Sequence, residues 1–316
     1  MILAPMQGLT EVLFRRVYEE CFPGAIQLSV SPFLSLTHNL QQAPQATLRN
    51  MLFDVLPENN IGSIPVIPQI LGKEPKEFIE LANRLYDLGY QEINWNMGCP
   101  MRKVTGKHRG SGILPYPDEV RAVLDAVIPN IKARMSVKMR IGQREPREIF
   151  QLVPILNDYP LASVTIHPRL GRQQYTGVPD LSTFGEVLPL LKAPVIYNGD
   201  ICTATDAQRI KERFPVVTDI MIGRGILYDP TLPLAINGQM TESGKSKTDE
   251  AKRFIRKLME EIAKTLPTEE SRIRKTKEYW CLLWHSLPIS EIQARQVLRQ
   301  KELTFVDNLI EQYTIK

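Results

Sequence analysis

Short apolar segments alternate with longer amphipathic ones over about the first 230 residues, and this alternation constrains the fold more than any other feature. The apolar segments predict buried strands, and the apolar residues at helical spacing between them predict helices. Eight such strand–helix units predict an α/β fold, the (β/α)8 TIM barrel. An open doubly wound sheet has the same periodicity, but no GxGxxG follows the first strand, which weakens a dinucleotide-binding Rossmann fold.

The expected strands and helices can be placed by residue number. Strands are expected at 2–5, 25–30, 66–71, 91–96, 135–139, 162–166, 194–198 and 219–222. Thr10 is a candidate N-cap for a helix that reaches Tyr18, and Pro75 suits the first turn of another helix. Further helices are expected at 117–128, 147–156 and 203–213, and the polar segment 37–60 is expected to contain a helix and a loop.

The pattern changes after Pro233. Residues 237–247 are rich in Gly, Ser and Lys, which is typical of a linker. Beyond them, apolar stripes over 251–266 and 280–287 predict helices that end at Pro267 and Pro288. The sequence therefore predicts two domains, a barrel over 1–238 and an all-α helical bundle over 239–316.

Composition excludes several classes of protein. No apolar run approaches the roughly 18 residues of a membrane span, and the first residues lack the pattern of a signal peptide. The four cysteines lie far apart, without a CxxC or a Cys/His pair, so neither a metal site nor a disulfide framework is expected. We expect a cytoplasmic protein that acts as a monomer.

The net charge of +4 arises entirely in the C-terminal segment, because residues 245–316 hold 15 Lys and Arg against 11 Asp and Glu. This bias is compatible with an anionic partner such as RNA, although a solvated helical face explains it equally well. The candidates for phosphate contacts are Arg272, Arg274, Lys275 and Lys277. The alternative is that they pair with Glu269, Glu270 and Glu278 on a solvated surface.

Polar residues gather where the expected strands end: Gln69, Asn94, Asn96, Lys138, Arg140, His167, Arg169, Asn198, Asp200 and Arg224. In a barrel of parallel strands, the active site is built at these carboxyl ends. Lys138 lies within an apolar strand, where burying its ammonium is costly unless an anion or acceptor meets it. A bound polar cofactor is the simplest explanation.

Three turns at strand ends carry possible chemistry. Cys99 lies between Gly98 and Pro100, where it is either a buried structural thiol or a reactive group. The turns Asn198-Gly199-Asp200 and Gly223-Arg224-Gly225 follow consecutive strands, at the place where barrels bind phosphate. Either glycine turn alone is weak evidence, but the two together favour a phosphate site.

These residues belong to a series of motifs that resembles the tRNA-dihydrouridine synthase family over the whole chain. The motifs are Ile2 to Thr10 (ILAPMQGLT), Phe14-Arg15, Gln69, Asn96 to Pro100 (NMGCP), Val137 to Arg140 (VKMR), His167-Pro168-Arg169, Asn198 to Ile201 (NGDI) and Ile222 to Gly225 (IGRG). As a set they are highly specific.

The resemblance implies an FMN-bearing barrel joined to a helical tRNA-binding domain. The enzyme would reduce the C5–C6 bond of a uridine in tRNA, with NADPH or NADH as reductant. By family pattern, Cys99 would be the proton donor, Asn96 and Arg140 would contact the uridine, and Arg169 would lie at the RNA entrance. The residues implied to hold the flavin are Pro5, Met6, Gln7, Gln69, Lys138, His167, Asn198, Gly199, Asp200, Gly223 and Arg224.

The chain departs from the family pattern in three places. Ser31-Pro32 replaces the usual Thr-Glu-Met, and Pro168 and Leu170 replace residues of His-Gly-Arg-Thr. Residues 107–109 replace a more glycine-rich stretch after the cysteine. Because His108 has a basic neighbour on each side, we expect it to face RNA or solvent and not to act as a catalytic partner.

Two other functions are compatible with the sequence. The first is a flavin barrel that acts on free pyrimidines, of the dihydroorotate or dihydropyrimidine dehydrogenase type. The second is a catalytically inactive RNA-binding module on the same fold. The sequence does not decide which uridine of the tRNA would be modified.

Overall fold

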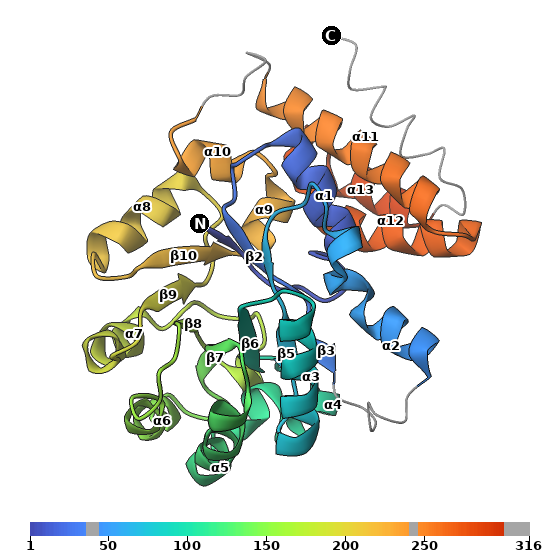
Figure 1. Cartoon of the computed structure of the whole chain (residues 1–316). Coiled ribbons are helices and arrows are strands. Elements are labelled where there is room, and N and C mark those ends of the chain that lie inside the picture. Colours follow the sequence, from blue (N-terminus) through green and yellow to red (C-terminus); the bar gives the residue numbers. More distant parts are fainter. Residues whose placement is uncertain (36–43, 240–245, 300–316) are drawn as a thin grey trace.

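The computed structural model describes residues 1–35, 44–239 and 246–299, and it shows a closed barrel of parallel strands surrounded by helices (Figure 1). Barrel closure comes from β1, which pairs with β10 on one side and with β2 on the other. The strands are β1 (Ile2–Leu3), β2 (Leu28–Val30), β3 (Leu34–Ser35), β4 (Val66–Ile67), β5 (Gln69–Leu71), β6 (Glu92–Met97), β7 (Arg134–Gly142), β8 (Val164–Leu170), β9 (Val195–Asn198) and β10 (Asp219–Ile222).

The ten short strands occupy eight strand positions of the barrel, because the strand at two of these positions is interrupted by proline. Pro68 separates β4 from β5, and Pro32 lies between β2 and β3. Proline has no N–H to donate to the ladder, so pairing is broken at these residues. The two interrupted strands are still neighbours on both sides of the prolines, since β2 pairs with β4 and β3 pairs with β5. The predicted α/β barrel is therefore confirmed.

The helices cover the outside of the barrel and continue into the C-terminal segment (Figure 1). They are α1 (Val12–Cys21), α2 (Gln45–Leu52), α3 (Pro75–Asp87), α4 (Arg102–Thr105), α5 (Pro117–Val127), α6 (Glu148–Leu156), α7 (Leu181–Val187), α8 (Ala204–Arg213), α9 (Arg224–Tyr228), α10 (Leu232–Ile236), α11 (Lys247–Thr265), α12 (Glu269–Leu283) and α13 (Glu291–Arg299). Short 3-10 turns lie at 53–55, 57–59, 110–113, 128–130, 171–173, 188–190 and 284–286.

Some element boundaries differ from the expectation. Thr10 is not the N-cap of α1, which is Glu11; the Thr10 hydroxyl instead donates to the carbonyl of Ala4 and accepts from the N–H of Met6. Thr203 does cap α8, where its hydroxyl accepts from the N–H of Asp206. Strands β7 and β8 extend further than predicted because they pair with each other beyond Arg140.

The C-terminal helices share one hydrophobic core with the barrel. In Figure 1, α11 and α12 lie beside α1, and α13 packs against α12. The ring of Phe14 on α1 lies 5.4 Å from that of Phe254 and 6.2 Å from that of Tyr279, measured between centroids. Part of the predicted linker, residues 240–245, lies outside the described residues. The domain boundary at 238 stays a prediction. No helix among the described residues is long and apolar enough to cross a membrane.

Candidate active site

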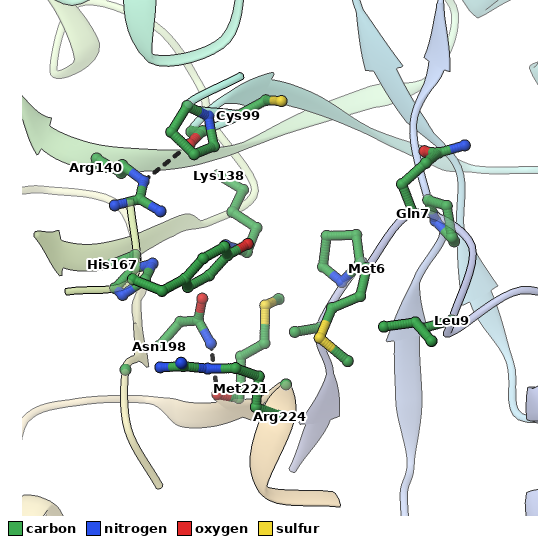
Figure 2. A pocket seen from close by; sticks show the side chains of 18 of the residues that line it. Met6, Gln7, Leu9, Cys99, Lys138, Arg140, His167, Asn198, Met221 and Arg224 are labelled. Atoms are coloured by element: carbon green, nitrogen blue, oxygen red, sulfur yellow. Dashed lines mark hydrogen bonds between the residues drawn. The ribbon is translucent and has the colours of Figure 1, made fainter. Parts of the chain in front are cut away.

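A cavity of about 550 Å³ opens at the carboxyl ends of the strands, where the sequence predicts the site. Lys138, Arg140 and His167 project into it from β7 and β8, with Met6 opposite them (Figure 2). The predicted residues that line it are Pro5, Met6, Gln7, Asn96, Cys99, Lys138, Arg140, His167, Asn198, Gly199, Asp200, Gly223 and Arg224. The structure thus brings together residues from across the first 224 positions of the chain.

Gln69 is predicted to touch the flavin, but it is fully buried and does not line the cavity. Its Nε2 donates to Oδ1 of Asn94 at 2.8 Å, and its Oε1 accepts from Nδ2 of Asn96 at 2.7 Å. Both ends of the Gln69 amide are therefore used inside the barrel. In this structure Gln69 orients the asparagine that supports the Cys99 turn, and direct contact with a cofactor stays a prediction.

The Cys99 turn is held by its neighbours. Oδ1 of Asn96 accepts from the N–H groups of Gly98 and Cys99, at 3.0 and 2.9 Å. The carbonyl of Cys99 accepts from the N–H of Ser111 at 3.0 Å. Gly110 has φ of +56°, and a Cβ there would lie 2.6 Å from the Cys99 carbonyl oxygen. Only glycine allows the chain to return this close to the cysteine.

Burial raises the pKa of the Cys99 thiol above its ordinary value, although Arg140 and Lys138 act in the opposite direction. The thiol is therefore protonated at neutral pH. A protonated thiol can serve as an acid, whereas a nucleophilic cysteine needs a group that ionises it.

Lys138 brings an ammonium group to the cavity without a partner. Among the residues that the structure describes, none forms a hydrogen bond or an ion pair with its Nζ, and it lines the cavity (Figure 2). Burial, and secondarily the charge of Arg140, lower the pKa of Lys138 to about 7. Lys138 is half-buried, and at a pKa of about 7 it is charged only in part at neutral pH. A charged amine with no acceptor is costly in such a site, which indicates that a polar ligand completes it.

Arg140 is held by backbone carbonyls. Its Nε donates to Gly98 at 3.0 Å, and its Nη1 donates to Leu170 and Gln174 at 3.0 and 2.7 Å. Burial lowers the pKa of Arg140 to about 10, so the guanidinium is still charged at neutral pH. Nη2 has no hydrogen-bond partner in the described part of the chain, and it is the donor left for a ligand.

Three charged side chains form a network beside the cavity. Asp200 accepts from Nη1 of Arg169 at 2.8 Å and from Nη2 of Arg224 at 2.8 Å, and it forms a second, shorter bond with Arg169. Burial raises the pKa of Asp200, but the two guanidinium groups outweigh this and lower it. Asp200 is therefore anionic and would repel a phosphate. Its contribution to the predicted phosphate site would be to orient Arg224, while Arg169, nearly fully buried, does not itself line the cavity.

His167 is neutral in this environment. Burial and the charges of Arg140 and Lys138 hold its pKa well below the ordinary value. Nη1 of Arg169 lies 3.2 Å from Nε2 of His167, and because arginine can only donate, Nε2 accepts and Nδ1 carries the hydrogen. His167 is therefore a hydrogen-bond donor through Nδ1.

The two glycine turns lie where predicted, on the wall formed by β9 and β10. Asn198 donates from Nδ2 to the carbonyl of Met221 at 2.8 Å, which joins the two strand ends (Figure 2). A Cβ at Gly225 would lie 2.0 Å from the carbonyl oxygen of Ile201, so the second turn requires glycine at that position. Phosphate binding by these turns stays a prediction.

The four cations on α12 are not equivalent. Lys275 is only 14% exposed, and its Nζ donates to the carbonyl of Gly8 and to Glu11, both at 2.6 Å. These contacts join α12 to the barrel, and the phosphate contact predicted for Lys275 stays a prediction. Nε of Arg272 donates to the carbonyl of Leu266 at 2.7 Å. Arg274 is exposed, and Lys277 is half-buried. Neither side chain forms a hydrogen bond or an ion pair with any residue that the structure describes.

The residues that line the cavity but were not assigned to it from the sequence include Tyr175, Met101 and Leu282. The ring of Tyr175 lies 5.6 Å from the guanidinium carbon of Arg140 and 4.9 Å from that of Arg224. Tyr175 belongs to an irregular segment after β8, where no periodicity identifies it. Leu282 comes from α12, so the C-terminal helices contribute to the cavity. No cluster of three or more possible metal ligands occurs among the described residues.

The fold and the cavity define the class of protein: an α/β-barrel enzyme with a polar, cationic site at the carboxyl ends of its strands. Solved structures of this shape include morphinone reductase, with a TM-score of 0.51, 13% identity and coverage of 76% of this chain and 86% of that one. The old yellow enzyme from Trypanosoma cruzi has a TM-score of 0.51 and 9% identity, over 77% of this chain and 89% of that one. At these identities the likeness shows the fold alone.

The relatives in sequence are more specific. tRNA-dihydrouridine synthase B of Pasteurella multocida is 30% identical over 73% of this chain and 67% of its own length. Its counterpart in Escherichia coli K12 is 31% identical over 71% of this chain and 67% of its own length. The family model described as dihydrouridine synthase (Dus) matches residues 2–308. This chain therefore belongs to the dihydrouridine synthase family, and it is an oxidoreductase.

Proposed function

We propose that this protein reduces the C5–C6 double bond of a uridine in tRNA, with FMN as cofactor and NADPH as reductant. The observation that carries the proposal is the pairing of a protonated thiol, Cys99, with an unpartnered cation, Lys138, in one cavity at the strand ends. A family named for dihydrouridine synthesis supplies the reaction class.

The residues present fit a flavin mononucleotide. A cavity of about 550 Å³ is in the usual range for a small-molecule site of roughly 300–1,000 Å³. Lys138 offers a cation to the polar edge of the ring system, the segment Pro5-Met6-Gln7 offers a wall, and the turns after β9 and β10 offer a phosphate end. When bound there, the cofactor would supply the hydride.

The protein's own groups would then position the uracil and complete its reduction. Cys99 would donate its thiol proton to C5, since burial keeps that proton in place at neutral pH. The free Nη2 of Arg140 would hold a uracil oxygen. Asn96, predicted to contact the uridine, has two donors on its Oδ1 and gives one hydrogen bond through Nδ2, so its main contribution would be to fix Cys99.

The C-terminal helices would form the tRNA-binding part of a cytoplasmic, monomeric enzyme. The target base must leave its RNA stack to reach Cys99. Leu282 on α12 lines the same cavity as Cys99, which puts the C-terminal helices beside the route that this base would take. The exposed Arg274 is the strongest remaining candidate for a phosphate contact on α12.

The decisive experiment is reduction of unmodified tRNA by the purified, yellow protein with NADPH, compared with NADH and with free uracil and orotate. Dihydrouridine formed in tRNA alone supports the proposal. Turnover of the free pyrimidines with no retention on a tRNA column would favour the dehydrogenase alternative, and a colourless protein that binds tRNA would favour the inactive module. Mapping dihydrouridine in tRNA from cells that lack the protein would identify the uridine.

A further inference from the structure

The segment from Cys99 to α5 folds back on itself and is anchored twice. The first anchor is Ser111, whose N–H donates to the Cys99 carbonyl and whose Oγ lies 2.7 Å from Oε1 of Gln143. The second anchor is His108, three residues earlier, and it contacts a different part of the molecule. Sequence reasoning expects His108 to face RNA or solvent, and the structure places it in a cluster of protein side chains instead.

Both direct contacts of His108 come from the start of α5, where Tyr116 is the N-cap. Its Nδ1 lies 2.8 Å from Oε1 of Glu119 on α5, and its ring stacks on Tyr116 with centroids 3.9 Å apart and planes 11° apart. Oε2 of Glu119 lies 2.7 Å from Nζ of Lys73, in the loop after β5. We name these four residues, Lys73, His108, Tyr116 and Glu119, the His108 clasp. It connects the Cys99 loop to α5 and, through Lys73, to the loop after β5.

The chemistry of the clasp is well defined. Partial burial raises the pKa of Glu119, but the hydrogen bonds from Lys73 and His108 outweigh it, so the carboxylate is ionised and can only accept. Nδ1 of His108 therefore carries the hydrogen that it donates. His108 has φ of +50°, a left-handed conformation that is unfavourable for a residue with a side chain. Its contacts with Tyr116 and Glu119 offset that cost.

The position of the clasp couples it to Cys99. Between His108 and Ser111 the chain passes through Gly110, where a Cβ would lie 2.6 Å from the Cys99 carbonyl oxygen and 3.0 Å from its Cβ. The backbone at Gly110 therefore packs closely against Cys99. We expect a shift of His108 away from Tyr116 to displace Ser111, three residues later, and to weaken its hydrogen bonds to Cys99.

We propose that the His108 clasp is a positioning device that holds the Cys99 loop closed, so that the thiol stays half-buried in the cavity wall. His108 is thus a positioning residue for the proton donor. The catalytic consequence rests on the proposed function. The effect on the burial of Cys99 does not, because it concerns the loop alone.

Three substitutions separate the contributions of the clasp. His108→Asn keeps a donor near the position of Nδ1 and tolerates positive φ, but it loses the ring. His108→Phe keeps the stack on Tyr116 and loses the donor. His108→Ala loses both. The matched control is Arg121→Gln on the same helix, α5. It breaks the ion pair between Arg121 and Asp158 and leaves the Cys99 loop unchanged.

The measurement is the rate at which iodoacetamide alkylates Cys99 in the full-length protein as purified, followed by peptide mass spectrometry. Cys281, which is exposed, and Cys202, which lines the same cavity, are internal references in every sample. We expect His108→Ala to speed alkylation of Cys99 about tenfold, with Asn and Phe intermediate and Arg121→Gln unchanged, because local opening exposes the thiol. The rates at Cys281 and Cys202 should not change.

A second measurement tests the positioning role. With pre-reduced flavin, His108→Ala should lower the single-turnover rate of tRNA reduction, while reduction of the flavin by NADPH stays at the wild-type rate, and His108→Asn should recover part of the loss. Equal alkylation of Cys99 in wild type and His108→Ala would overturn the inference. Absence of tRNA reduction by the wild type, with the alkylation difference present, would overturn the proposed function and leave the clasp standing.

Discussion

Four cationic side chains lie in or beside the cavity, and four others follow one another on α12, but the structure uses the two groups differently. Lys138 and Arg140 line the cavity from β7, and Arg224 lines it from the turn after β10; Arg140 and Arg224 are oriented by hydrogen bonds, and Lys138 is left without an acceptor. On α12, Lys275 and Arg272 donate hydrogen bonds to backbone carbonyls of the protein itself. Charge density along a helix therefore says less about function than charge at the end of a barrel strand.

The largest expected effect of a substitution in the cavity is at Cys99. Cys99→Ala removes the proposed proton donor, so tRNA reduction should fall by about 10²- to 10⁴-fold in a single turnover with pre-reduced flavin. Flavin reduction by NADPH should stay near normal. Cys99→Ser should recover little, because a hydroxyl is a far weaker acid than a thiol. Near-normal tRNA reduction by Cys99→Ala would return this cysteine to a purely structural role.

Lys138→Met tests whether the unpartnered cation serves a ligand. Flavin affinity should fall about tenfold or more, since the ligand loses a charged partner, as measured by fluorescence titration of flavin-free protein. The stability of the flavin-free protein should increase, because the substitution removes a charge that has no acceptor. The pKa of Lys138 is lowered to about 7, so the cost of its buried charge is complete below pH 7 and disappears as pH rises toward the ordinary lysine value.

The thermal midpoint of flavin-free Lys138→Met should therefore exceed that of the wild type more at pH 6 than at pH 9. A difference that is the same at both pH values would show that Lys138 keeps its charge in the folded protein. Arg134→Gln is a suitable control, because Arg134 lies on the same strand, and its guanidinium is exposed and paired with Glu92.

On α12, Lys275→Met should affect stability more than RNA binding. Its ammonium is nearly buried and donates to Gly8 and Glu11, so we expect a loss of about 1–2 kcal/mol in the free energy of unfolding by urea. The affinity for tRNA, measured under conditions where the variant is folded, should change little. A large drop in affinity with unchanged stability would support the phosphate contact predicted for Lys275.

The smallest expected effect belongs to Arg274→Gln combined with Lys277→Gln. Neither side chain has a partner in the described part of the chain, so stability should stay within about 0.5 kcal/mol of wild type. If both contact phosphate, the slope of log Kd against log salt should decrease by about 1 to 2. An unchanged slope would mean that neither Arg274 nor Lys277 contacts phosphate.

The fold could be predicted from the sequence because barrel strands buried on both faces are apolar and their ends carry the polar residues. For the same reason, Lys138, His167 and Asn198 could be assigned to one site before their positions were known. Strand order alone places them at a common edge. The helix predicted at 203–213 is present as α8, and the structure shows Thr203 as its N-cap.

What could not be predicted depends on contacts between distant residues. The pairing of Gln69 with Asn94 and Asn96 follows from the register between β5 and β6. The orientation of Lys275 follows from which face of α12 meets α1 and the loop before it. Tyr175 and His108 lie in irregular segments, where no periodicity exists and only the surrounding structure determines the position of a side chain.

Because α1, α11 and α12 share one core, the C-terminal helices are hard to remove or to exchange. Phe14 contacts both Phe254 and Tyr279, so a chain cut after residue 238 would leave an aromatic face of the barrel open to water. The C-terminal helices therefore could not be exchanged between relatives as an independent unit. Any such exchange would have to carry α1 with it, and with α1 the loop that contributes Met6 to the cavity wall.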